Sequence, residues 1–244
     1  MRTIYAICDY KNHFGTKYTA IPYRSGMNKN LLNKYFSEKG FRIEFIQTGN
    51  FDFSKQTINR QIFIYTSSED KRGLYKSFLN DLILALELSG GIVIPRHMYM
   101  HAHENKVFFE LLRQLSKNNE LNFIKSKCFG TFEEMEKFGK FDFPVVLKSP
   151  MGSKSRGVFL ANNQEELNKT VKKISNSKFF YHDLKDFVRA LIHKNYIKES
   201  FYRNKFLIQS FIPNLNNDWK VLVYGDKYYC LKRRNRKNDF RASG

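Results

Sequence analysis

The most informative part of the chain reads FPVVLKSPMGSKSRGVFLA from Phe143 to Ala161. An apolar run of strand length ends at Lys148, a loop follows, and a second apolar run begins at Val158. Pro144 can start a strand, and the valines and leucine after it fit a pleated, buried surface. We therefore expect two strands joined by this loop.

The loop between these strands has the composition of a phosphate-binding turn. Gly152 and Gly157 permit positive φ angles, so the backbone can approach a ligand closely and its N–H groups can point at phosphate oxygens. Lys148, Lys154 and Arg156 add positive charge. The alternative is an ordinary surface hairpin with solvated bases, and the segment alone does not decide between the two.

The composition is that of a strongly basic globular protein. The 244 residues include 42 Lys and Arg against 23 Asp and Glu, which gives a formal net charge of +19, and 42% of the residues are hydrophobic. This length allows one large or two smaller domains. The positive charge attracts nucleotides, nucleic acid, acidic carbohydrate or a membrane face, and it does not choose among them.

Three cysteines, Cys8, Cys128 and Cys230, are far apart in the chain and have no metal-ligand spacing. We therefore expect neither a disulfide framework nor a zinc site. Cys8 and Cys230 lie in apolar runs, which predicts that both are buried. The amino terminus is too short in apolar length for a signal peptide, and no stretch approaches a membrane span. These features predict a protein of the reducing cytoplasm with no membrane partner.

The first part of the chain alternates between strand and helix patterns. Strands are expected at residues 3–8, 41–47, 61–66 and 92–95, and helices at 31–36 and 70–88. Because parallel strands need a crossover between them, this order predicts a small α/β domain with a parallel sheet.

Most of the histidines follow this region. His97, His101, His103 and Glu104 could form a metal cluster, but a loop with no assignable period restrains their geometry little, so we prefer a structural loop without a metal.

Beyond residue 104 the expected elements change in kind. Thr131 and Glu134 form the pattern of a capping box at a helix start. Helices are also expected at residues 107–115, 163–174 and 183–192, an apolar strand at 206–213, and two strands around the turn at Gly225 and Asp226. The basic carboxyl-terminal hairpin could alternatively bind nucleic acid, with Tyr224, Tyr228 and Tyr229 as stacking surfaces.

The order of these segments resembles the ATP-grasp superfamily, which includes glutathione synthetase, D-alanine ligases and the glutamate ligase that modifies a ribosomal protein. The resemblance covers roughly residues 90–244. Four pieces carry it, in chain order: Asn105-Lys106, the stretch Phe143–Ala161, Gln209-Ser210-Phe211-Ile212, and Asp218-Trp219-Lys220-Val221-Leu222-Val223 with Asp239-Phe240-Arg241.

The resemblance implies a mixed α/β (α+β) ATP-grasp fold. Its expected divisions are an amino-terminal parallel-sheet α/β domain at 1–95, a linker helix and connecting segment at 96–143, a lid subdomain with the glycine loop at 144–208, and a hinge with an incomplete carboxyl-terminal subdomain at 209–244.

The resemblance also implies a nucleotide site. Lys106 and Lys148 neutralise the α- and β-phosphates, a task suited to point charges on long stems. The amides of residues 152–157, including Gly152, Ser153 and Gly157, close over the β- and γ-phosphates. The rest of the nucleotide-binding set consists of backbone groups at Gln209 and Phe211 on the adenine edge, Val146 and Ile212 on its face, and Ser210 and Asp218.

The resemblance further implies that Lys232, Arg234 and Arg241 hold the γ-phosphoryl group and the acidic substrate. Strand alternation leaves open which of Lys232, Arg233 and Arg234 points inward. For each base the alternative is a solvated surface side chain.

The implied activity is that of an ATP-dependent carboxylate–amine ligase. A substrate carboxylate attacks the γ-phosphorus of ATP, and an amine then displaces phosphate from the acyl phosphate, while Mg²⁺ bridges the ATP phosphates. The expected partners are ATP, a small-molecule or peptide carboxylate and an amine, with a homodimer through the amino-terminal domain. Two alternatives remain: a kinase-like phosphotransferase of the same fold, and a non-enzymatic nucleic-acid binder explained by the charge of +19.

Two features depart from the family pattern. Lys220 stands where the motif usually has arginine, which removes a bidentate fork. The family's magnesium ligands lie downstream of the D-F-R piece, whereas this sequence ends at Gly244. Three explanations are open: the chain is a fragment of a longer protein, a partner supplies the ligands, or the protein has lost catalysis. We favour the fragment, because the sequence ends directly after the D-F-R piece.

Overall fold

The computed structural model describes residues 1–15, 26–54, 57–67, 70, 73–152, 157–235 and 239–241. It divides into two compact units, Met1–His103 and Glu104–Gly244. The finer boundaries expected at residues 95, 143 and 208 stay predictions.

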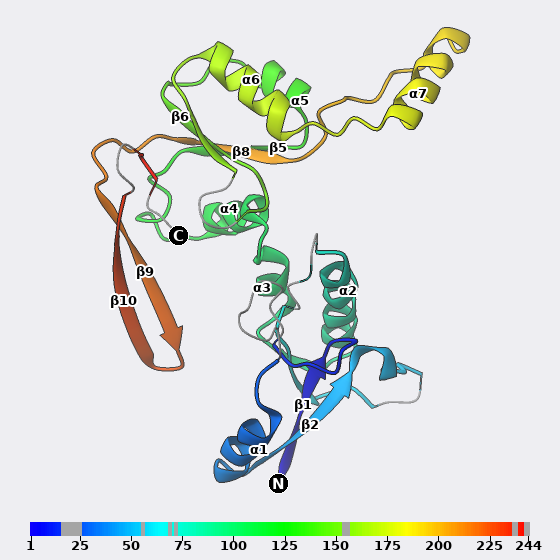
Figure 1. The fold of residues 1–244 in the computed structure, drawn as a ribbon, viewed down its shortest axis with the longest axis vertical. Helices are drawn as coiled ribbons and strands as arrows, with labels where there is room; N and C mark the ends of the chain where they lie inside the picture. The colour runs from blue at the N-terminus through cyan, green and yellow to red at the C-terminus, as the bar shows by residue number, and fades with distance from the viewer. Residues whose placement is uncertain are drawn as a thin grey trace. The chain divides into compact units, whose positions relative to one another are not determined.

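The first unit is built on a parallel sheet, as the alternating pattern predicts. Its strands have the order β2-β1-β3-β4, and every described pair is parallel. In chain order the elements are β1 (Arg2–Cys8), α1 (Lys29–Glu38), β2 (Phe41–Gln47), the short 3₁₀ helix η1 (Thr48–Asn50), β3 (Ile62–Ile64), α2 (Leu74–Leu88), β4 (Ile92–Ile94) and α3 (His97–Ala102) (Figure 1).

Alternate residues of β1 supply two different apolar clusters. Ala6 and Cys8 pack in a cluster that includes Leu32 and Phe36 of α1. Ile7, between them in sequence, belongs to the cluster that contains Ile83 of α2. Because successive side chains of a strand point to opposite faces, the sheet is covered by a helix on each face.

The second unit is organised around an antiparallel sheet with the strand order β5-β8-β6-β7. A separate two-stranded sheet pairs β9 with β10. The elements are α4 (Lys106–Leu115), β5 (Ser126–Phe129), α5 (Phe132–Phe138), β6 (Val145–Lys148), β7 (Val158–Ala161), α6 (Gln164–Ile174), α7 (Phe180–Ile192), β8 (Phe206–Ser210), β9 (Asn217–Tyr224) and β10 (Lys227–Arg234).

Strand β6 separates the core of this unit from the face that carries its basic side chain. Val145 and Leu147 belong to the buried cluster that contains Met135 of α5 and Leu167 of α6. Lys148 takes the opposite side of the strand by alternation. Helices α5 and α6 lie on one side of the sheet and α4 on the other (Figure 1). The strand therefore turns Lys148 away from the core and toward α4.

Of the two cysteines expected to be buried, only one is buried. Cys8 is fully buried, as expected, but Cys230 is exposed, so its predicted burial is wrong. Cys230 lies on β10, which pairs only with β9 among the described residues, so the apolar residues of this hairpin remain exposed. Within the described ranges, every helix is too short or too polar to cross a membrane.

The capping box at the start of α5 gives a test of local stability. Thr131 accepts a hydrogen bond from the Glu134 N–H at 3.1 Å, and the Glu134 carboxylate accepts one from the Thr131 N–H at 3.1 Å. We expect Thr131→Ala to lower the free energy of unfolding by about 1 kcal/mol. Thr131→Ser keeps the acceptor and should lose much less. Urea denaturation of both variants, followed by circular dichroism, measures the difference, and equal losses would contradict the cap.

Candidate functional site

A buried carboxylate on α4 is the centre of a polar network in the second unit. The helix begins beside Asn105, whose side chain accepts a hydrogen bond from the Phe108 N–H at 3.2 Å. One turn further on, Glu110 is only 4% exposed. Arg113 lies on the same side of the helix, and its Nη2 is 2.5 Å from Glu110 Oε1. Its Nη2 also donates to the Ile124 carbonyl oxygen at 2.9 Å.

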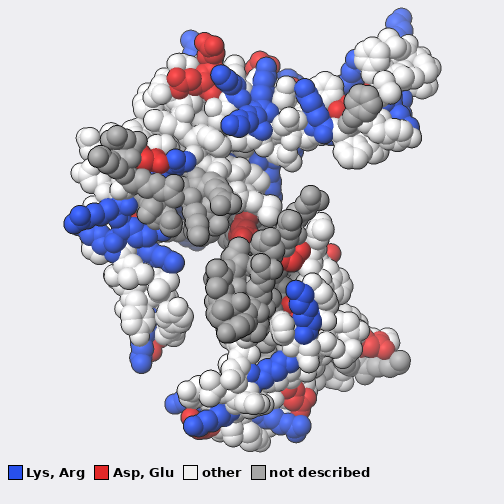
Figure 2. All heavy atoms as spheres, viewed as in Figure 1, with Lys and Arg blue, Asp and Glu red and all other residues white. Residues whose placement is uncertain are grey.

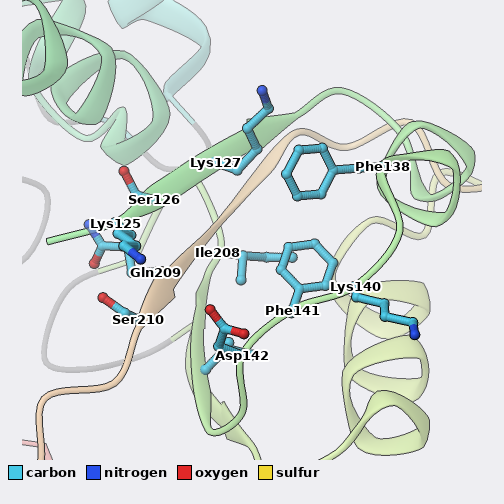
Figure 3. A pocket seen from close by; sticks show the side chains of 11 residues that line it. Lys125, Ser126, Lys127, Phe138, Lys140, Phe141, Asp142, Ile208, Gln209 and Ser210 are labelled. Atoms are coloured by element: carbon cyan, nitrogen blue, oxygen red, sulfur yellow. The ribbon is translucent and has the colours of Figure 1, made fainter.

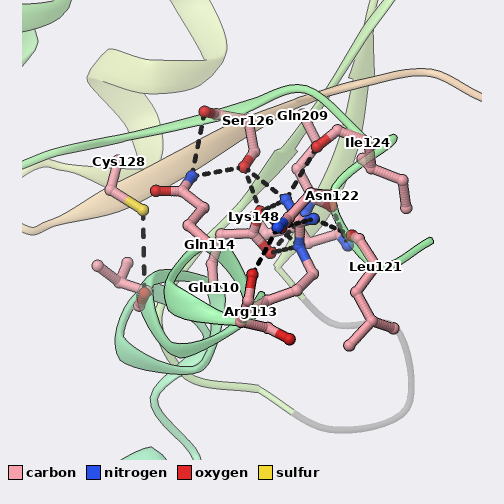
Figure 4. Close-up of polar contacts among 12 residues, drawn as sticks. Glu110, Arg113, Gln114, Leu121, Asn122, Ile124, Ser126, Cys128, Lys148 and Gln209 are labelled. Atoms are coloured by element: carbon pink, nitrogen blue, oxygen red, sulfur yellow. Dashed lines mark hydrogen bonds and ion pairs between the residues drawn. The ribbon is translucent and has the colours of Figure 1, made fainter. Parts of the chain in front are cut away.

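Gln209 of β8 connects this carboxylate to Lys148 of β6. Its Nε2 donates to Glu110 Oε2 at 2.8 Å, and its Oε1 accepts from Lys148 Nζ at 2.5 Å. The Ser126 hydroxyl of β5 donates to the other oxygen of Glu110. Figure 4 shows these contacts converging between the helix and the strands. The carboxylate thus joins α4 directly to β5 and β8, and through Gln209 to β6.

Glu110 and Lys148, the charged groups at the two ends of this network, differ in how well their charges are compensated. Burial raises the pKa of Glu110, but hydrogen bonds from Arg113, Ser126 and Gln209 outweigh burial and leave that pKa below its usual value. Burial lowers the pKa of Lys148, and the charge of Glu110 opposes this only in part. The carboxylate of Glu110 is therefore well compensated, whereas the half-buried ammonium group of Lys148 is compensated only in part.

Lys106 adds a second cation close to Lys148. Its Nζ donates to the Gly152 carbonyl oxygen at 2.8 Å, and its backbone N–H donates to the Pro150 carbonyl oxygen at 2.9 Å. Burial lowers the pKa of Lys106, and repulsion by Lys148 lowers it further, while Glu104 raises it. The two predicted phosphate-binding lysines thus act on one another electrostatically, as groups of one site do.

A cavity of about 300 Å³ lies beside Lys148. Residues predicted from the sequence to bind the nucleotide line much of its wall. These residues are Val146, Lys148, Gln209, Ser210, Phe211, Ile212 and Asp218, and they are joined by Arg241, which was predicted to hold the substrate. The structure therefore gathers residues from four separate segments of the chain. Lys106, Lys232 and Arg234 do not line the cavity.

The glycine loop has a structural reason for its second glycine. Gly157 has a φ of +74°, and a Cβ added there would lie 1.9 Å from the Ser149 hydroxyl oxygen. Its carbonyl oxygen accepts a hydrogen bond from the Ser149 N–H at 2.8 Å. Gly152 also has a positive φ, of 126°. Ser153, Lys154 and Arg156 lie outside the described residues, so their predicted contacts with phosphate stay predictions.

The β9–β10 hairpin shows which of the three bases Lys232, Arg233 and Arg234 is connected to the cavity. Arg233 binds Asp218 through two hydrogen bonds, Nε to Oδ1 at 2.7 Å and Nη2 to Oδ2 at 2.5 Å. Because Asp218 lines the cavity, Arg233 is the base of β10 that is connected to it. Lys232 and Arg234 take the opposite face by alternation, and Lys232 Nζ lies 5.5 Å from the Trp219 ring centre. Their predicted roles stay predictions.

Arg241 closes another part of the cavity wall. It forms an ion pair with Asp239 at 2.6 Å, and its Nη1 donates to the Val158 carbonyl oxygen at 3.3 Å. The Phe240 ring packs edge-on against Phe211, with ring centres 6.0 Å apart. These contacts bring the D-F-R piece against the hinge segment and the strand that follows the glycine loop.

The described residues do not fit a magnesium site. Asp218, which lines the cavity, binds Arg233, and Asp239 binds the wall residue Arg241. In the described part of the chain, no group of three or more potential metal ligands comes together. We therefore derive no step through a metal from these residues.

A second cavity, of about 230 Å³, opens on the core side of the same sheet (Figure 3). The rings of Phe138 and Phe141 and the side chain of Ile208 form its apolar wall, while Lys125 and Lys127 at its rim are exposed. It contains none of the predicted phosphate-binding lysines. The cavity beside Lys148 is therefore the better candidate site, because a half-buried cation lines it.

Sequence reasoning missed the residues that support Lys148. Glu110, Arg113 and Ser126 lie in no motif, and the spacing of Glu110 and Arg113 is equally typical of a solvated helix face. Strand alternation alone does not distinguish Arg233 from Lys232 and Arg234. The presence of Glu110 within the otherwise apolar run 107–112, with Arg113 directly after it, is the only signal in the sequence for this network.

The chain was compared with known protein families, curated proteins and solved structures. No curated protein matches it. Among solved structures, a RimK domain ATP-grasp protein from Sphaerobacter thermophilus is 14% identical with a TM-score of 0.40, and 90% of this chain covers 68% of that one. D-alanine–D-alanine ligase from Helicobacter pylori is 12% identical with a TM-score of 0.40, and the similarity covers 100% of this chain and 77% of that one.

For N5-carboxyaminoimidazole ribonucleotide synthetase from Thermotoga maritima the identity is 14% and the TM-score 0.43. There 96% of this chain spans only 53% of that protein. Similarities this low do not assign a substrate. The RimK-like ATP-grasp domain, however, matches residues 111–243, which is more than half of the chain. The chain therefore belongs to the RimK-like ATP-grasp family.

Proposed function

We propose that the chain binds ATP in the cavity beside Lys148 and uses it to join a carboxylate to an amine. The observation that carries this proposal is the half-buried ammonium group of Lys148, which has only partial charge compensation, at a cavity of a RimK-like ATP-grasp domain. A partly desolvated cation without an anionic partner attracts an anion strongly. A phosphate group is such an anion.

The cavity wall has separate parts for the two ends of a nucleotide. In this proposal, Lys148 at the cavity wall and Lys106, which is outside the wall but close to Lys148, bind the phosphates, where two point charges offset the charge of neighbouring oxygens. Val146 and Ile212 offer apolar surface for the adenine ring. The Phe211 N–H donates to the Pro144 carbonyl oxygen at 3.3 Å. We therefore propose that Phe211 contacts adenine through its carbonyl oxygen instead.

The proposed chemistry takes place in two steps. An oxygen of the substrate carboxylate attacks the γ-phosphorus, the bond from that phosphorus to the ADP oxygen breaks, and an acyl phosphate forms. The amine then attacks the acyl carbon and phosphate leaves, with loss of a proton from nitrogen. In this proposal, Arg241, which lines the cavity, holds the anionic groups during transfer. The bridging Mg²⁺, the homodimer and the cytoplasmic location stay predictions of the sequence.

We further propose that Glu110 and Gln209 are positioning residues for Lys148. Gln209 receives the ammonium group on its oxygen and is itself held by Glu110 through its nitrogen. Since an amide group has one acceptor end and one donor end, the fixed carboxylate determines which end faces Lys148. The lysine is thereby held in one place before a ligand arrives.

A thermal-shift experiment tests the nucleotide site. With MgATP at about 100 times its dissociation constant, binding adds about 2.7 kcal/mol of stability, so the wild-type Tm should rise by several degrees. Lys148→Ala should lose most of that rise. The matched control is Lys127→Ala, an exposed lysine on the opposite face of the same sheet. If ATP raises the Tm of all three proteins equally, the phosphate site has been placed wrongly.

The pH dependence of stability tests the role of Glu110. Its folded pKa is below the unfolded value, so its stabilisation is present above about pH 4.5 and is lost as the pH falls through the folded pKa. Glu110→Gln should lower the free energy of unfolding at pH 7 by about 3 kcal/mol, with a smaller difference at lower pH. Urea midpoints from pH 7 to pH 3.5 measure this.

Two readouts distinguish positioning from stability alone. Glu110→Gln should weaken ATP binding even at temperatures where the variant is fully folded, whereas Glu110→Asp should restore part of the affinity. Parallel pH curves for wild type and Glu110→Gln, or unchanged ATP affinity, would overturn the positioning role.

Trapping with hydroxylamine separates a ligase from a phosphotransferase. With ATP and a panel of amino acids and short peptides as carboxylates, formation of an acyl phosphate releases ADP. Hydroxylamine then displaces phosphate from the acyl carbon and gives a hydroxamate, which is detected as its coloured iron(III) complex. We expect both products in equal amounts from the accepted carboxylate, and neither from Lys148→Ala. A stable phosphate ester without hydroxamate would instead identify a kinase-like reaction.

A further inference from the structure

Helix α7 has an apolar side that nothing in the described chain covers. At 100° per residue, Tyr181, Leu184, Phe187, Val188, Leu191 and Ile192 fall on one side of the helix. Leu184 is 54% exposed, Leu191 72% and Ile192 69%. None of the helix's described side chains is buried. An apolar side this open is unusual for a helix of a folded domain.

The polar side of the same helix is occupied by the chain itself. Asp186 accepts hydrogen bonds from the Tyr196 hydroxyl and from the Glu199 N–H, the latter at 3.0 Å. Arg203 forms an ion pair with Glu199. A small polar cavity of about 100 Å³ lies between the helix and this following segment. The segment therefore fixes the helix by its polar side and leaves the apolar side outward.

Basic side chains border the exposed apolar side on both edges. Lys185 Nζ lies 4.3 Å from the Tyr181 ring centre, at one edge. Lys198 Nζ lies 4.5 Å from the Phe187 ring centre, at the other. Lys178 and Lys194 are exposed just before and after the helix. In Figure 2, the region that Figure 1 labels α7 shows mainly uncharged atoms with Lys and Arg around them.

We propose that α7 docks on the surface of an anionic lipid bilayer. An interfacial helix buries an apolar side at the boundary of headgroups and acyl chains and keeps lysines and arginines beside it for anionic headgroups. The rings of Tyr181 and Phe179 suit the same boundary, where aromatic side chains are enriched. This proposal does not rest on the proposed ligase activity, and it revises the sequence expectation of no membrane partner.

The same charges disfavour a second copy of the chain as the occupant. In an antiparallel two-fold pair of α7 helices, equivalent edges meet, so Lys185 and Arg189 of one copy would face the same residues of the other. In a parallel two-fold pair, this edge would face the edge beside Phe187, where Lys198 lies. Like charges at such edges are unfavourable. A bilayer with anionic headgroups offers the opposite charge along the whole helix.

Vesicle co-sedimentation of the full chain tests the proposal. We expect binding to phosphatidylcholine vesicles that contain phosphatidylglycerol, weaker binding at high salt, and little binding to phosphatidylcholine alone. The double variant Leu184→Ser/Leu191→Ser should reduce the partition coefficient at least about tenfold, since each leucine contributes buried apolar area. Both side chains are exposed, so the fold should be kept, and circular dichroism checks this.

A matched control separates α7 from the general positive charge of the protein. Leu88→Ser/Leu115→Ser removes two leucines that are 79% and 78% exposed elsewhere in the chain, and it should bind the vesicles like wild type. Equal binding by wild type and both double variants would overturn the proposal, because net charge alone would then explain it. It would also be overturned if light scattering showed a dimer that Leu184→Ser/Leu191→Ser disrupts while vesicle binding is absent.

Discussion

A single buried carboxylate holds the candidate site of the second unit together. Glu110 contacts a guanidinium group of its own helix, a hydroxyl group of β5 and an amide group of β8. A buried charge is costly unless it is paired and hydrogen-bonded, and here its oxygens have such partners. Loss of one partner would leave a desolvated charge without compensation. Because the partners Ser126 and Gln209 belong to the sheet, the need to keep them fixes the position of α4 on the sheet.

The arrangement has a consequence for the lysine at its far end. Among the described residues, Lys148 is joined to Glu110 through the neutral amide of Gln209, which gives it a hydrogen bond acceptor rather than a carboxylate in direct contact. Desolvation of its half-buried ammonium group lowers its pKa, and the charge of Glu110 opposes this only in part. A carboxylate in direct contact would compensate the lysine and compete with a phosphate. The intervening amide instead orients the cation and leaves its attraction for an anion largely intact, which is how preorganised electrostatic sites work.

The sequence predicts local features of this fold better than contacts between distant elements. The capping box of Thr131 follows from a pattern of four residues, and the parallel sheet of the first unit follows from the alternation of strand and helix patterns along the chain; both are confirmed. The contact of Gln209 with Glu110 joins residues 99 positions apart, and no local period indicates it. Burial of Cys230 was predicted wrongly for a related reason: an apolar strand is buried only if another layer covers it, and its own sequence does not contain that layer.

The core and the site cannot vary independently, because strand β6 serves both. Val145 and Leu147 fill the apolar cluster, while Val146 and Lys148 line the cavity on the other face. A slip of one residue in the pairing with β8 would exchange these two sets, burying a lysine in the core and exposing two aliphatic side chains. The core therefore enforces the register, and the register places the cation beside Gln209. The apolar alternation in this strand thus specifies the position of the charged group as strictly as the hydrogen bonds that hold it.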